Sequence, residues 1–235
     1  MKTHLYKEIR ALDQKLYEQA AEVAETLGKV VKAFLSGNTG EAEKIIEHDE
    51  AIDRNEIFIE EECLKLLALY QPVAGDLRYI ITVLKVNGEL ERIGDLAVDI
   101  AEFTAQADVS CTEKAPVDFE SMTASVRRML DSSIKALSGH NVPLATEVIM
   151  ADEAIDDLHN RFSASFPQCI REDSENIPAY QALLGVSRSL ERIADCATNI
   201  AEDVIYLESG RIVRHASSCL LSDEVRSVPG IENHS

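Results

Sequence analysis

Apolar side chains recur every three or four residues along six stretches of the chain, which is the spacing of one buried face of an α-helix. The first stretch shows this pattern with Leu5, Ile9, Leu12 and Leu16. Short segments rich in Gly, Pro, Ser and Asn separate the stretches and are typical of breaks between helices. The pattern therefore predicts six long helices, over residues 4–35, 41–70, 73–108, 118–138, 141–172 and 176–210.

Several predicted helix ends carry residues that commonly cap helices. Gly139 and Gly210 are suited to end helices, because glycine adopts the left-handed conformation at little steric cost. Asn141 and Asn176 are suited to cap the next two helices, and each is followed by a proline in the tolerated first turn. The breaks are short, so we expect consecutive helices to form antiparallel hairpins.

Two motifs occur twice along the chain. The segment 49–53 (Asp-Glu-Ala-Ile-Asp) recurs unchanged at 152–156, and the segment 89–102 recurs at 189–202 with nine of fourteen positions identical. A repeat of about 100 residues indicates a duplicated unit of three helices rather than a continuous coiled-coil rod. We therefore predict an all-α protein of two tandem, sequence-related three-helix bundles, at 1–110 and 111–210, followed by a poorly ordered tail at 211–235.

The charge of the chain limits the kinds of partner that it can bind. Its 235 residues include 42 acidic and 23 basic side chains, which gives a net charge of −19. Such a charge repels nucleic-acid phosphates and anionic lipid headgroups. We therefore expect no nucleic-acid partner and no direct membrane binding, and we expect cations or a basic protein surface instead.

The cysteines and the apolar segments indicate in which cellular compartment the protein resides. The five cysteines form no C-x-x-C motif and no evident disulfide framework. The first ten residues carry charges where a signal peptide needs an apolar stretch, and no apolar run approaches the roughly 18 residues of a membrane span. These features predict a cytoplasmic protein that reaches the membrane only through its partners.

Acidic side chains form rows within the repeated motifs. Glu91, Asp95 and Asp99 are four residues apart and share one helix face, which continues an apolar row through Leu84 and Leu77. Clustered carboxylates that lose contact with water are costly unless positive charge compensates them. Bound cations would supply that charge, so we predict metal ligands in both halves: Asp49, Asp53, Glu91, Asp95, Asp99, Asp152, Asp156, Glu191 and Asp195.

The chemistry of these ligands limits the metal and the activity. Oxygen ligands favour hard divalent or trivalent ions, namely iron, Mn, Mg or Ca, with Zn as a further candidate. Gly88 and Gly94 lie in the same helix and indicate a close helix approach or room for ions. Structural ion pairing of these acidic residues with neighbouring arginines is the alternative to metal binding.

No enzymatic activity is indicated by the motifs. A di-iron oxidase needs Glu-x-x-His on two helices, whereas Asp156 and His159 make a single acid-x-x-His. No motif indicates a nucleophile, so we predict no enzymatic activity.

The motifs resemble those of the PhoU family, the accessory regulators of bacterial phosphate uptake. The likeness is carried by Gln71–Arg78 (Gln-Pro-Val-Ala-Gly-Asp-Leu-Arg), Leu90–Asp95 (Leu-Glu-Arg-Ile-Gly-Asp) and Leu190–Asp195 (Leu-Glu-Arg-Ile-Ala-Asp), and it extends over residues 1–210. The resemblance implies two three-helix bundles, multinuclear metal clusters and self-association as a homodimer. Asp99 stands where the family usually has Asn, as the second half does at Asn199.

The resemblance also implies a function. Members restrain the phosphate-starvation response when phosphate is plentiful, through the ATPase subunit of a phosphate ABC transporter and a phosphate-sensing histidine kinase. The acid rows leave open a metal-dependent hydrolase or a metal-storage protein, and the chain could also serve a different phosphate permease. The family's metal motifs fall on four pairs: Asp49 with Asp53, Glu91 with Asp95, Asp152 with Asp156, and Glu191 with Asp195.

Overall fold

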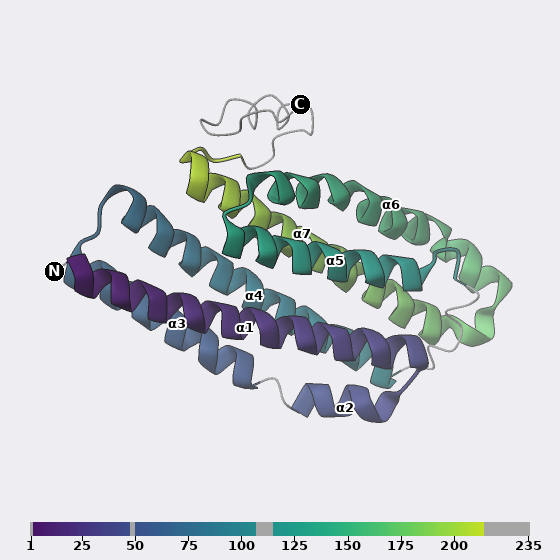
Figure 1. Cartoon of the computed structure of the whole chain (residues 1–235). Coiled ribbons are helices and arrows are strands. Elements are labelled where there is room, and N and C mark those ends of the chain that lie inside the picture. The colour runs from purple at the N-terminus through teal and green to yellow at the C-terminus, as the bar shows by residue number, and fades with distance from the viewer. Residues whose placement is uncertain (1, 48–49, 107–114, 214–235) are drawn as a thin grey trace.

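The chain folds into long helices, and no strand occurs in the residues that the structure describes (Figure 1). The computed structural model describes residues 2–47, 50–106 and 115–213. Asp49 and most of the predicted tail lie outside these ranges. The all-α prediction is confirmed, and the elements are α1 (Lys2–Ser36), α2 (Thr39–Glu47), α3 (Glu50–Tyr70), α4 (Ala74–Gln106), α5 (Phe119–Gly139), α6 (Val142–Glu172), the 3-10 helix η2 (Ser174–Asn176) and α7 (Ile177–Ser209).

The second predicted helix, over residues 41–70, is two helices in the structure. α2 buries Ala42 and Ile45, and α3 buries Ile52, Ile59 and other apolar side chains further along the chain. Both helices pack on α1 and α4, but α2 lies beyond the end of α3 (Figure 1). The prediction of one continuous helix is therefore wrong, although each part keeps the predicted apolar periodicity.

The predicted helix caps are confirmed at Asn141 and Gly210. The Asn141 side chain accepts a hydrogen bond from the backbone N–H of Leu144 at 3.0 Å, and Gly210 adopts a left-handed conformation with φ 72°. At the end of α5 the left-handed residue is His140, with φ 51°, and Gly139 is the last helical residue, so the predicted cap lies one residue too early. The prediction for Asn176 is wrong. Its backbone (φ −105°, ψ 20°) is not extended as a capping residue requires, and its amide donates instead to both carboxylate oxygens of Asp173 at 2.9 Å.

The predicted apolar faces form the core. The stripe of Leu5, Leu12 and Leu16 is buried along α1 as the spacing predicts. In α4 the row that leads to the acidic residues is buried at Ile80, but Leu77 is exposed because it lies in the first turn, at the end of the bundle. The core therefore begins one turn later than the sequence predicts.

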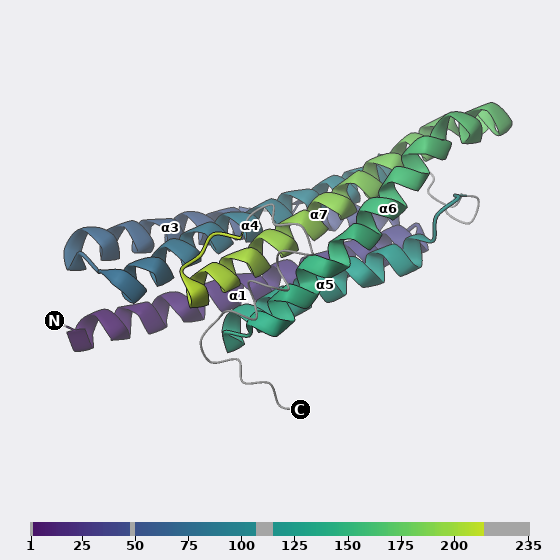
Figure 2. The ribbon, with the colours of Figure 1, turned by 90° about the horizontal axis from the view of Figure 1, so that it is seen from above.

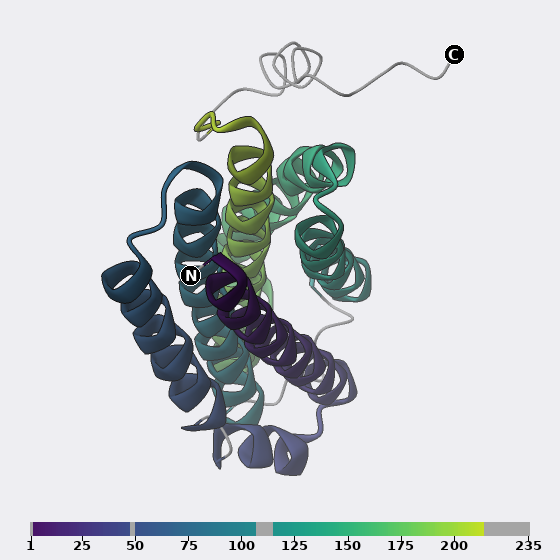
Figure 3. The same cartoon turned by 60° about the vertical axis from the view of Figure 1, so that its left-hand side comes forward.

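α4 and α7 form the centre of the molecule and run antiparallel (Figure 2). Viewed closer to the helix axes, α3 flanks α4 on one side, α5 and α6 lie on the side of α7, and α1 crosses in front (Figure 3). The seam between α4 and α7 joins the two sequence-related halves along most of their length. The domain boundary at residue 110 remains a prediction, because each half contributes a central helix to the same interface.

Contacts along this seam follow the internal repeat. Lys85 of α4 forms an ion pair with Asp203 of α7, with Nζ 2.6 Å from Oδ1. The repeat offset of 100 residues relates Lys85 to Gly185 and Asp203 to Phe103, and these two also meet, because a Cβ on Gly185 would lie 2.5 Å from Phe103 Cζ. The duplication therefore produces a local two-fold relationship between α4 and α7, centred near Gly94 and its counterpart at position 194.

Candidate metal centre

Three acidic residues of the first half come together between α3 and α4. Asp53 lies on α3, and Glu91 and Asp95 lie one turn apart on α4. One carboxylate oxygen of each residue lies within 4.8 Å of the others. Asp53 and Asp95 are exposed and Glu91 is half-buried, so the group is open to ions from solvent.

The neighbouring residues explain why α3 approaches α4 closely at this point. A Cβ on Gly94 would lie 3.1 Å from Ile52 Cδ1, so the missing side chain leaves just enough room for Ile52, the residue before Asp53. Asn87 is 1% exposed, and its amide donates a hydrogen bond to the backbone oxygen of Glu56 at 2.9 Å. The expected role of Gly94 in close approach is confirmed. Gly88 makes no such close approach, because no atom lies within 4 Å of its would-be Cβ.

The electrostatics of this group favour a cation. Partial burial raises the pKa of Asp95, and the negative charges of Asp53 and Asp99 raise it further. Burial also raises the pKa of Glu56, one turn along α3, with added repulsion from Glu60 and Asp53. A raised pKa means that the ionised carboxylate is disfavoured, and a bound cation would remove that penalty.

The carboxylates of the predicted ligands in the second half lie further apart than those of the first half. Asp152 and Asp156 lie on α6, and Glu191 and Asp195 lie on α7. Burial and the charges of Asp156, Asp195 and Glu191 raise the pKa of Asp152 to about 7, so the four carboxylates share one electrostatic environment. No three of them bring oxygens within 4.8 Å of one another in the described part of the chain, unlike Asp53 and its neighbours.

Two further predicted residues have different surroundings. Asp99 raises the pKa of Asp95 but lines an adjoining pocket, with Asp95, rather than joining the group of three. Its repeat counterpart Asn199 donates a hydrogen bond to Glu89 Oε1 at 3.1 Å across the α4–α7 seam. Asp49 lies outside the described residues.

Asn87 and Ser187 occupy the same position in the two halves, and neither was predicted from the sequence as a functional residue. Each lies one turn before the acidic row, and Ser187 Oγ lies 3.0 Å from His159 Nδ1 just as Asn87 contacts Glu56. His159 and Glu56 are themselves counterparts at the repeat offset of 103 residues. Aligning the two halves identifies these polar positions, which composition and periodicity alone do not.

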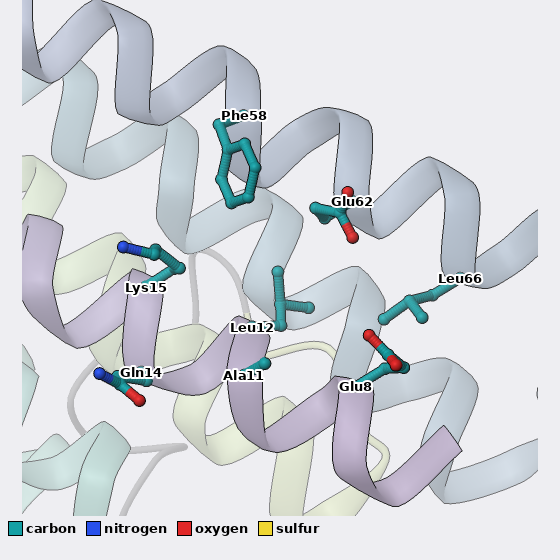
Figure 4. A pocket seen from close by; sticks show the side chains of 8 residues that line it. All are labelled: Glu8, Ala11, Leu12, Gln14, Lys15, Phe58, Glu62 and Leu66. Atoms are coloured by element: carbon teal, nitrogen blue, oxygen red, sulfur yellow. The ribbon is translucent and has the colours of Figure 1, made fainter. Parts of the chain in front are cut away.

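A separate pocket of 190 Å³ lies between α1 and α3, further along α3 than Asp53 (Figure 4). Phe58 reaches from α3 toward α1, where Leu12 and Lys15 lie, and Glu62 and Leu66 line the α3 side (Figure 4). No three of the lining side chains form a group that could hold a metal ion. The candidate metal centre is therefore distinct from this pocket.

Comparison with known proteins identifies the family. The sequence model of the PhoU domain matches residues 5–104 and 119–204, one match in each half of the chain. The chain belongs to the PhoU family. This confirms the resemblance that the repeated motifs indicate, and the two matches agree with the internal duplication.

Individual relatives share most of their length with this chain. The phosphate-specific transport system accessory protein PhoU homolog of Aquifex aeolicus is 36% identical over 211 residues, covering 90% of this chain and 96% of that protein. The Escherichia coli protein PhoU is 27% identical over 208 residues, covering 88% and 86%. Crystal structures of PhoU from Pseudomonas aeruginosa (TM-score 0.81, 31% identity, 88% of this chain and 99% of that chain) and from Streptococcus pneumoniae (TM-score 0.80, 31% identity, 89% and 99%) have the same fold.

The helices of this chain do not meet the requirements of a membrane span. Among the described residues, none combines sufficient length with a sufficiently apolar sequence to cross a bilayer.

Proposed function

We propose that this chain is a regulatory accessory protein of a phosphate transport system, without catalytic activity of its own. The match of both halves to the PhoU domain carries the proposal. Relatives in Aquifex aeolicus and Escherichia coli are named as phosphate-specific transport system accessory proteins. In this proposal the chain acts in the cytoplasm as a homodimer. It couples the ATPase subunit of a phosphate ABC transporter to a phosphate-sensing histidine kinase and restrains the starvation response when phosphate is plentiful.

A deletion strain tests the regulatory role. Removal of the gene should release a phosphate-starvation reporter during growth in high phosphate, and the intact gene supplied in trans should restore repression. Co-purification of the tagged chain should recover the transporter ATPase and the kinase. Normal repression in the deletion strain would argue against this role. Recovery of a single-component phosphate permease instead of the ATPase would favour the alternative transport system.

We propose further that Asp53, Glu91 and Asp95 hold a hard cation, with Asp152, Asp156, Glu191 and Asp195 as the corresponding site of the second half. The donors fit such an ion, because they are carboxylate oxygens from two helices that lie within 4.8 Å of one another in the first half. Burial and the neighbouring negative charges raise the pKa of Asp95 and of Asp152, and a bound cation would offset both effects. Iron, Mn, Mg and Ca are the expected ions, and more than one ion per site suits the number of carboxylates.

Elemental analysis of the purified protein tests the metal site. Asp95→Asn combined with Asp195→Asn should lower the bound metal per chain, because each substitution removes a negative ligand from one half. Asp131→Asn is the matched control, since Asp131 is exposed on α5 and belongs to neither acidic group. Equal metal content in all three proteins would exclude the proposed ligands.

A further inference from the structure

A second pocket, of 280 Å³, lies on the α4–α7 seam beside the candidate metal centre. Asp95 belongs to both, because it lines the pocket and is one of the three clustered carboxylates. Arg92 and Asp99 of α4 and Arg192 of α7 supply the other charged groups, and Leu96 and Val98 complete the lining. The pocket therefore combines two guanidinium groups with a carboxylate that we assign to metal.

The internal repeat explains why two arginines meet here. Arg92 and Arg192 occupy the same position in the two halves, next to Glu91 and Glu191. Since the two-fold relationship between α4 and α7 is centred near Gly94, side chains close to this centre approach their own counterparts. Both arginines line this one pocket, which places their side chains near the same point on the seam.

These guanidinium groups are available to a ligand. Within the described parts of the chain, neither Arg92 nor Arg192 takes part in a hydrogen bond or a salt bridge, although Arg128 on α5 donates to Ser125 Oγ at 3.0 Å. Arg92 is exposed and Arg192 is half-buried, so solvent reaches the pocket. A guanidinium carries five N–H donors in a planar fork that fits two oxygens of a phosphate or carboxylate.

We propose that this pocket binds a tetrahedral oxyanion of the phosphate class when cations occupy the neighbouring carboxylates. The inference rests on the metal sites of the proposed function. Without cations, Asp95, Asp99 and Asp195 offset the two arginines and repel an anion. With Asp95 and Asp195 neutralised by metal, Asp99 is the acidic side chain that remains in the pocket lining, beside two guanidinium groups, and the local field becomes more favourable to a negative ligand. Anion binding is therefore conditional on metal.

Equilibrium dialysis of inorganic phosphate against the full chain tests this proposal. One sample is loaded with Mn²⁺ and freed of excess ion, and the other is stripped with a chelator, at equal ionic strength. Bound manganese is measured in the same samples. We expect saturable phosphate binding to the loaded protein and at least about tenfold weaker binding to the stripped protein.

Substitutions distinguish the contribution of the arginines to phosphate binding from that of the metal. Arg92→Gln with Arg192→Gln should retain manganese and weaken phosphate binding by about tenfold or more, because two charge-assisted contacts are lost. Arg92→Lys with Arg192→Lys keeps the charge but loses the planar fork, so its affinity should lie between those of the Gln variant and the wild type. Arg128→Gln is the control and should bind phosphate as the wild type does. Circular dichroism confirms that each variant is folded.

Four results would overturn the proposal. Retained manganese without phosphate binding, or equal phosphate binding by the Gln variant and the wild type, would exclude the arginine pocket and leave the metal site intact. Equal binding with and without metal would exclude the dependence on cations. Failure of the wild type to retain any metal would overturn the proposed metal site, and this inference with it.

Discussion

Lys85 and Asp203 form an ion pair across the α4–α7 seam, with Nζ 2.6 Å from Oδ1, although Asp203 is only 4% exposed. The Lys85 ammonium also lies 5.0 Å from the centre of the Tyr206 ring. At the repeat-related position, Phe103 packs over Gly185 instead. The two ends of the seam therefore hold the same helices together by different means, a charge pair at one end and an aromatic ring over glycine at the other.

Removing one partner of the ion pair should destabilise the fold. Lys85→Met leaves the Asp203 carboxylate buried without its cation and should lower the free energy of unfolding by about 3 kcal/mol in chemical denaturation. Adding Asp203→Leu should recover most of that loss, because no uncompensated charge remains. Lys15→Met breaks only the exposed pair with Glu18 and should cost less than about 1 kcal/mol. Equal losses in Lys85→Met and Lys15→Met would contradict this account.

Gly185→Ala should destabilise the protein by about 1–3 kcal/mol, because the new methyl group would overlap the Phe103 ring. Phe103→Leu in the same chain should relieve the overlap and restore part of the stability. Gly88→Ala, on the other central helix α4, is the matched control, since nothing lies within 4 Å of its would-be Cβ. It should increase the free energy of unfolding by up to about 1 kcal/mol through helix propensity. A loss at Gly88 as large as that at Gly185 would be inconsistent with the packing.

The stability of the metal-free protein should fall as pH rises from about 4 to 7. Asp152 has a pKa of about 7 in the folded chain, raised by burial and by Asp156 from the ordinary value of 3.8. Between these values the unfolded chain has released the proton that the folded chain still binds, so raising the pH favours unfolding. The loss through Asp152 is at most about 4 kcal/mol.

Urea denaturation at several pH values, after chelation, checks this dependence. Asp152→Asn removes the titrating group and should flatten the profile, whereas Asp131→Asn on the α5 surface should leave it unchanged. Added Mn²⁺ should reduce the fall in the wild type, because a cation replaces the proton among the carboxylates. A profile that is flat in the metal-free wild type would rule out the raised pKa.

Asn87→Ala should affect both stability and metal binding. The variant loses the hydrogen bond to the Glu56 backbone oxygen, which fixes α3 against α4 one turn from the acidic group. Its free energy of unfolding should therefore be lower by about 1–3 kcal/mol. The metal content of the folded variant should fall because Asp53 is no longer held opposite Glu91. Asn55→Ala removes a half-buried bond to Glu22 of α1 and is the control, with metal content expected to be unchanged. Full metal content in Asn87→Ala would show that the hydrogen bond does not position the ligands.

Much of the fold follows from the sequence because its signals are repeated. The duplicated motifs predict that α4 and α7 are equivalent, and the acid spacing predicts that Glu91 and Asp95 share a face; the structure agrees with both. The separation of α2 from α3 was not predicted, because neither glycine nor proline stands between Ile45 and Ile52.

The sequence predicts which acidic residues share a helix face, but not which of them come together in the structure. Helical periodicity gives the direction of a side chain but not the distance between helices, so it treats both acidic rows alike. The distance depends on what lies between the helices, such as Ile52 against Gly94 in the first half. Asn176 shows the same limit on a smaller scale. Its identity suits a cap, but its amide forms its hydrogen bonds with Asp173.

The two-fold relationship near Gly94 has a mechanical consequence. Glu91 and Asp95 are fixed to α4, while Glu191 and Asp195 are fixed to its antiparallel counterpart α7, so a shift of one central helix along the other would change the separation of the two sets of carboxylates. The distance between the two acidic groups is therefore set by the packing of this one pair of helices.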